Sequence, residues 1–180
     1  MFVIAYQSCC RCIILIIMNY KKIFCWPPLL AGIGAATTIG ILGYITYESI
    51  LSDTSYGLWL FASFGSTVVL VFGYPDNAFA QPKNIFFGHL LAAFVGVVFL
   101  TFFEVNFITL AIAIGISTML MIALKIVHPP AGGNPIAVML GGVSFQFLVF
   151  PVMIGALTII IGGIIFNSLI LKRKYPISWK

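Results

Sequence analysis

The sequence predicts an all-α membrane protein whose six transmembrane segments form two inverted three-helix repeats. The first observation behind this fold class is composition: 62% of the 180 residues are hydrophobic and 7% are charged, whereas soluble domains carry about a quarter of charged residues. The second is the grouping of the apolar residues into six runs, and the third is a spacing of glycines shared by the two halves. Together they exclude a soluble globular domain.

The six expected segments follow from the length of each apolar run, because a hydrocarbon core about 30 Å thick needs about 20 helical residues. The second and fifth runs are short, and we expect their helices to be broken. Prolines at the start of the first, fifth and sixth runs suit the first turn of a helix, where no amide donor is needed. The segments are expected at residues 27–50, 58–74, 85–103, 107–127, 135–147 and 151–171.

This division gives a cytoplasmic N-terminal segment at residues 1–26, one transmembrane domain at residues 27–171 and a basic cytoplasmic tail at residues 172–180. With the N-terminus in the cytoplasm, all nine Lys and Arg residues fall on the cytoplasmic side, as the positive-inside rule requires. Glu104 then lies on the outer side. Whether residues 1–20 insert in the membrane stays open.

The two halves match weakly at a separation of 67 residues, where Gly65 aligns with Gly132 and Gly88 with Gly155. Each half would cross the membrane three times, so the second would be inverted relative to the first. Inverted repeats with interrupted helices at matching positions are typical of transporter binding sites. The alternative is chance recurrence in a chain rich in glycine.

The segment at residues 128–135, His-Pro-Pro-Ala-Gly-Gly-Asn-Pro, interrupts the apolar sequence with a backbone that cannot continue a helix. In lipid, such a backbone is tolerated only where it is buried in protein or lines a watery cavity. A helix starting at Asn134 or Pro135 would point its positive end at that cavity, which favours an anion. The hydroxyl-rich stretch 63–67 holds the matching place in the first half.

We therefore predict a binding site for a small inorganic anion between two broken helices, built from neutral donors and one titratable group, His128. The alternative role for His128 is a structural hydrogen bond to a carbonyl freed by proline. His89 could reach the same cavity or serve helix packing. The predicted substrate-binding residues are His128, Gly132, Gly133, Asn134, Gly65, Ser66, Thr67 and His89.

Other chemistry is not expected. The four acidic residues avoid the middle of the spans, so the sequence offers no carboxylate pair for cations. It holds no nucleotide-binding loop, and its basic residues flank apolar runs rather than form a nucleic-acid surface. We expect no cofactor, no metal, no nucleic acid and no enzymatic activity; an intramembrane hydrolase would need Ser66 within hydrogen-bond reach of His128 or His89. The four cysteines, at positions 9, 10, 12 and 25, are interpreted as free thiols.

Two stripes of small residues, 32/36/40 and 88/92/96, are interpreted as faces for close helix packing. They could serve within one chain or between chains, so a homo-oligomer stays open. A membrane scaffold or assembly subunit is therefore one alternative function, and an anion channel with a different substrate is another.

Three blocks carry a family resemblance: residues 128–135, residues 62–67 (Ala-Ser-Phe-Gly-Ser-Thr) and the loop at residues 73–84 (Gly-Tyr-Pro-Asp-Asn-Ala-Phe-Ala-Gln-Pro-Lys-Asn). In this order they resemble the HPP family of integral membrane proteins, over about residues 27–171. The resemblance implies transport of nitrite or a similar small monovalent anion. With no regulatory module after the last span and no polar leader, we expect a prokaryotic inner (plasma) membrane with both termini cytoplasmic.

Overall fold

Helices make up all the regular structure in the part of the chain that the computed structural model describes, residues 26–50 and 57–179. The expected all-α class is confirmed for these residues. The predictions for the four cysteines and for the inserted or cytoplasmic state of residues 1–25 lie outside them. The elements are α3 (Trp26–Ile50), α4 (Gly57–Val68), η1 (Val69–Gly73), η2 (Ala78–Ala80), α5 (Pro82–Phe102), α6 (Phe107–Ala123), η3 (Pro129–Gly133), α7 (Asn134–Gly141), η4 (Leu148–Met153), α8 (Ile154–Ile164) and η5 (Ile165–Ile170).

Three helical stretches within the described residues are long and apolar enough to cross a membrane: Pro28–Thr46, Pro82–Phe102 and Leu148–Ile170. The third is α8 with its extensions η4 and η5. Two further apolar helices, Ala62–Gly73 and Phe107–Ala123, are shorter. The chain is thus a membrane protein, and helices lie within all six expected segments. The expected break in the second helix is wrong, because residues 63–67 lie inside the regular helix α4, which continues as η1 to Gly73.

Local chemistry explains where several helices begin and end. Pro82 occupies the first turn of α5, and Asn106 caps α6 by accepting from the amides of Ile108 and Thr109. The expected continuation of α6 to residue 127 is wrong, because Lys125 adopts a positive φ of 55° and the helix ends at Ala123. The helix expected at 135–147 also ends early, where Gly142 takes a left-handed φ of 62°.

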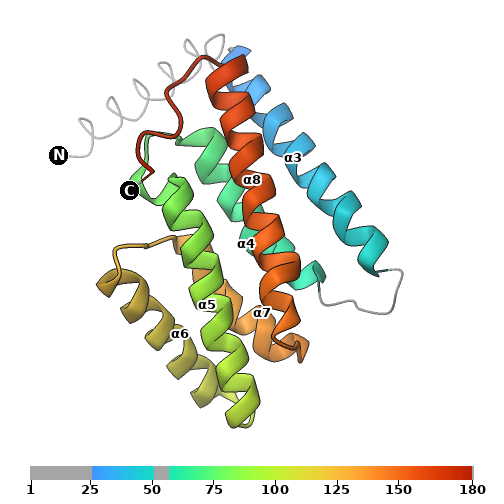
Figure 1. Ribbon diagram of the computed structural model, residues 1–180, viewed down its shortest axis with the longest axis vertical. Helices are drawn as coiled ribbons and strands as arrows, with labels where there is room; N and C mark the ends of the chain where they lie inside the picture. The colour runs from blue at the N-terminus through green and yellow to red at the C-terminus, as the bar shows by residue number, and fades with distance from the viewer. Residues whose placement is uncertain (1–25, 51–56, 180) are drawn as a thin grey trace, which may run out of the picture.

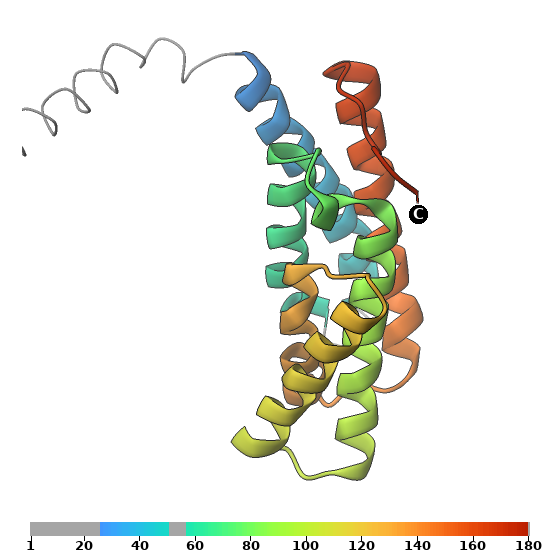
Figure 2. The ribbon, with the colours of Figure 1, turned by 90° about the vertical axis from the view of Figure 1, so that its left-hand side faces the viewer.

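Helix α5 is the centre of the arrangement and lies against α6, α7 and α8, while α3 packs against α8 (Figures 1 and 2). The core between these helices holds Phe64, Phe72 and Ile159. Many large apolar side chains point outward, among them Phe107 and Leu169, as expected of a surface that contacts lipid tails.

The two ends of the bundle differ in charge. The start of α3, the end of η1, the start of α5 and the end of η5 lie toward one end, whereas the α5–α6 turn and the α7–η4 loop lie at the other (Figure 1). Lys83, Lys125 and the tail at residues 172–174 belong to the first group, and Glu104 belongs to the second. This separation matches the predicted sidedness, and the cytoplasmic assignment of the basic end stays a prediction.

The two small-residue stripes have different surroundings. A Cβ added at Gly88 would lie 2.8 Å from His128 Cβ, and one at Gly96 would lie 2.9 Å from Pro135 Cα. This stripe brings α5 into close contact with the 126–138 segment. By contrast, a Cβ at Gly32 or Gly40 would meet nothing within 4 Å, so no described residue covers the stripe on α3.

Candidate functional site

The interruption at residues 126–133 is anchored to two neighbouring helices by side chains. Asn84 of α5 donates to the carbonyl of Val127 (2.8 Å), and Ser63 of α4 donates to the carbonyl of Pro130 (2.6 Å). These bonds satisfy carbonyls that a continuous helix would have bonded internally. Two carbonyls of the irregular backbone are therefore bonded to protein, and Ile126, His128 and Ala131 are buried, whereas Pro129 and Gly133 are exposed.

Beside this interruption, four polar side chains form a cluster that we call the histidine cluster: Thr67 of α4, His89 of α5, His128 and Asn134 of α7. All four are 0% exposed. The hydroxyl oxygen of Thr67 lies 2.9 Å from His89 Nε2 and 3.0 Å from His128 Nε2. Burying a polar group without a partner is costly. Four buried polar side chains gathered at one place are therefore a candidate functional site, and they also link the three helices.

The outer ends of the cluster fix the positions of its protons. His128 Nδ1 lies 2.7 Å from the carbonyl oxygen of Phe79, and a carbonyl only accepts, so Nδ1 carries the proton. Asn134 Nδ2 lies 3.0 Å from the His89 carbonyl and 3.0 Å from His89 Nδ1. The amide donates to both, so the proton of a neutral His89 is on Nε2. The two neutral rings therefore hold opposite tautomers.

One buried acceptor in the cluster has no partner among the residues that the structure describes: the Oδ1 atom of Asn134 makes no hydrogen bond to any of them. Rotating the amide would not help, because it would place Oδ1 against the His89 carbonyl, where Nδ2 now donates. This oxygen is therefore available to a group that can donate a hydrogen bond.

Two sets of contacts in and beside the cluster involve residues that are 67 positions apart, the separation at which the sequence predicts a repeat. Ser63 and Pro130, which hydrogen-bond, are 67 residues apart. Thr67 and Asn134 have the same separation, and they bond to the two ring nitrogens of the same residue, His89. His89 therefore lies between α4 and the start of α7.

The eight predicted site residues divide in two. Thr67, His89, His128 and Asn134 come together in the cluster. The other four take no part in these bonds: Ser66 is exposed and donates to its own helix at Ala62, Gly133 is exposed, and Gly65 and Gly132 are half-buried.

At the start of α7, whose positive end the sequence predicts to face an anion, the Asn134 N–H is already engaged, because it donates to the carbonyl of Ala131. The sequence reasoning missed Asn84 and the anchoring role of Ser63. Both are polar residues within apolar runs, which is the signal that could have found them.

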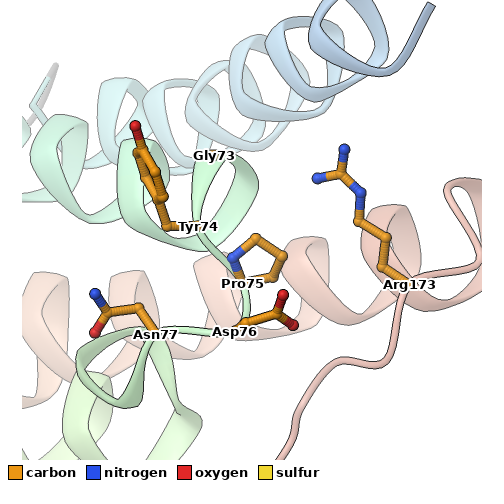
Figure 3. Close-up of a pocket in the computed structure, with 6 residues that line it drawn as sticks. All are labelled: Gly73, Tyr74, Pro75, Asp76, Asn77 and Arg173. Carbon is orange, nitrogen blue, oxygen red and sulfur yellow. The ribbon is translucent and has the colours of Figure 1, made fainter.

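An open depression of about 320 Å³ lies at the basic end; Asp76, Ala78, Gln81, Asn84, Lys125, Ile177 and Ser178 line it. One of these residues, Asn84, also donates to the carbonyl of Val127, the neighbour of His128. A second depression, of about 520 Å³, lies between the Gly73–Asn77 turn and Arg173 (Figure 3). Arg173 reaches from the C-terminal segment to the carbonyl of Phe72.

The C-terminal segment closes over the same loop that contacts His128. The Tyr175 hydroxyl donates to the carbonyl of Ala80, and the amide of Ile177 donates to Gln81 Oε1. Burial raises the pKa of Tyr175 above its usual value, so this hydroxyl stays a donor. Residues 79–81 are thus held by the cluster on one side and by the tail on the other.

Comparison with known proteins identifies the family. The family described as HPP, transmembrane region, matches residues 22–176. Two Dictyostelium discoideum proteins, both named only as transmembrane proteins, are 34% identical over 151 residues (79% of this chain, 52% of the relative) and 31% identical over 149 residues (78% and 48%). The chain thus spans about half the length of these curated relatives. No solved structure matches it. The chain belongs to the HPP transmembrane region family.

Proposed function

We propose that this chain transports nitrite, or a similar small monovalent anion, through the histidine cluster. The observation that carries the proposal is the meeting of α4, α5 and the interruption before α7 at a fully buried set of polar side chains. A membrane helix that is interrupted beside buried polar groups is typical of the binding sites of secondary transporters. Intramembrane ionisable residues generally mark the pathway of an ion or proton.

The chemistry of the cluster suits a small anion of single charge. Its groups are neutral donors and acceptors, and no Lys or Arg of the described residues takes part in its hydrogen bonds. A site with a fixed full charge would hold a monovalent anion too tightly for release, and conduction requires binding that is also reversible. Because the four side chains are buried, binding requires the interruption before α7 to move away from α4 and α5, which favours a carrier over an open pore.

The inverted repeat is part of this proposal and is supported by helix positions. Shifting α5, Pro82–Phe102, by 67 residues gives residues 149–169, close to the helical stretch Leu148–Ile170. We propose that the basic end of the bundle faces the cytoplasm, as the positive-inside rule implies. A prokaryotic inner membrane stays a prediction, since the two reported relatives come from Dictyostelium discoideum.

Nitrite flux into liposomes containing the purified protein tests the proposal. We expect flux above that of protein-free liposomes, and a fall of about tenfold or more in His128→Ala and in Asn134→Leu, because each removes hydrogen-bonding groups from the cluster. Thr158→Ala is the matched control; this exposed hydroxyl bonds only to its own helix. Unchanged flux in both cluster variants would refute the site.

Absence of flux for nitrite and other small anions would refute the transporter. That outcome would favour the alternative of a membrane scaffold, for which the open stripe at Gly32, Ala36 and Gly40 offers a face for a second helix. A homo-oligomer built on this face is compatible with either function.

A further inference from the structure

The Thr67 hydroxyl has more partners than it has hydrogens. Its oxygen lies 2.9 Å from the Ser63 carbonyl, 2.9 Å from His89 Nε2 and 3.0 Å from His128 Nε2. A hydroxyl donates once and accepts twice. Since His89 Nε2 donates to it, the single hydrogen of Thr67 must choose between the Ser63 carbonyl and His128 Nε2.

In the neutral cluster, the Thr67 hydroxyl donates its hydrogen to the lone pair of His128 Nε2. If His128 takes up a proton at Nε2, the hydroxyl rotates and donates to the Ser63 carbonyl instead. Both rings then donate to the two lone pairs of the Thr67 oxygen, and His128 Nδ1 still donates to Phe79. All four ring nitrogens of His89 and His128 keep a matched partner in both states, and the switch needs only rotation of the Thr67 hydroxyl hydrogen.

His89 cannot accept the proton as easily. Its free lone pair is on Nδ1, which receives the Asn134 amide. A proton on Nδ1 would face the N–H donor of the Asn134 amide, and the two donors would repel each other. Rotating the amide would set its oxygen against the His89 carbonyl. A second proton is also excluded, because the two ring centroids lie 4.9 Å apart and like charges at that distance repel strongly in a buried site.

Among the described residues, no other charge is placed to balance a proton on His128. On the elements packed against it, the titratable or charged groups besides His89 are Asp76, Lys83, Lys125 and Tyr175, together with the basic residues 172–174 of the tail. Asp76 and Lys125 are exposed and Lys83 is half-buried, all at the basic end, while Tyr175 bonds to Ala80. A buried charge without a partner is costly, so the proton would be stable there only together with an anion.

We propose that the histidine cluster binds one proton with each anion, with His128 Nε2 as the proton acceptor, so that transport is electroneutral. This inference rests on the proposed function. The proton comes from water on the side of entry, binds to the ring lone pair and leaves with the anion on the other side; no covalent bond to the anion is made.

The experiment measures anion uptake and lumenal pH in the same liposomes, with a potassium diffusion potential set by valinomycin. Mildly alkaline buffer keeps free nitrous acid scarce, and protein-free liposomes give the leak to subtract. We expect one proton per nitrite and a rate that does not change with voltage. Nitrite uptake that follows the voltage without acidification would overturn the inference and leave anion transport standing; no uptake at all would overturn the proposed function.

Two substitutions at Thr67 provide a matched pair. Thr67→Ser keeps the hydroxyl that links the rings and should keep one proton per anion. Thr67→Val has a similar shape without the hydroxyl, so we expect proton uptake to fall at least tenfold. Full proton uptake in Thr67→Val would overturn the role of the hydroxyl switch, and so would loss of proton coupling in Thr67→Ser with anion flux preserved.

Discussion

Gly88→Ala should lower the free energy of unfolding by about 1–3 kcal/mol and reduce nitrite flux at the same time. The new Cβ would lie 2.8 Å from His128 Cβ and 3.1 Å from the carbonyl oxygen of Ile126. Neither atom can rotate away, because one is on the backbone and the other is bonded directly to it. Helix α5 and the 126–128 segment would have to separate, which would displace His128 from Thr67. Denaturant-induced unfolding in mixed micelles measures the change in free energy, and nitrite uptake into liposomes measures the change in flux.

Gly115→Ala is the matched control for this substitution. Gly115 lies in α6, also within a helix, and its added Cβ would meet nothing within 4 Å. Alanine is the better helix former by about 1 kcal/mol, so this variant should be as stable as the native protein or slightly more so. If both variants behaved alike, the close contact between α5 and the interruption would be wrong.

Asn134→Asp should destabilise the protein by about 3 kcal/mol or more. The Asn134 side chain is 0% exposed and donates to the His89 carbonyl. An ionised aspartate would place an unpaired charge in the buried cluster and turn that donor into an acceptor facing a carbonyl. The midpoint of denaturant-induced unfolding, compared with the native protein at neutral pH, gives the size of the effect.

Asn77→Asp carries the same chemical change to an exposed position. Asn77 caps η2 by accepting from the amide of Phe79, and aspartate caps equally well. We expect its stability to stay within about 0.5 kcal/mol of the native value. Equal stability of Asn77→Asp and Asn134→Asp would mean that water reaches Asn134 in the resting state, contrary to the sealed cluster described above.

The sequence predicted where the helices lie and which residue types form the site, but it predicted less well where helices end and which way their side chains face. Long apolar runs predict α3, α5 and the Leu148–Ile170 stretch because bilayer thickness sets a minimum length. The end of α6 escaped prediction, since a left-handed Lys125 has no strong sequence signal.

Within the site, ionisable or polar residues in apolar runs identified all four members of the histidine cluster. Sequence could not tell that His89 is its centre, because a single chain gives the spacing along α5 but not which face meets α4 and α7. Nor could it separate Thr67 from its neighbour Ser66. Both have hydroxyls in the same segment, and only the packing of α4 turns one inward and the other outward.

The most direct test of the histidine cluster as an anion site is the nitrogen NMR spectrum of protein labelled at its two histidines, recorded in lipid with and without nitrite. Without nitrite, we predict opposite neutral tautomers, protonated at Nδ1 in His128 and at Nε2 in His89, assigned with His89→Gln. With nitrite, His128 should shift to the imidazolium form while His89 stays neutral. Two identical tautomers, or a spectrum that nitrite leaves unchanged in protein shown to transport it, would contradict the account.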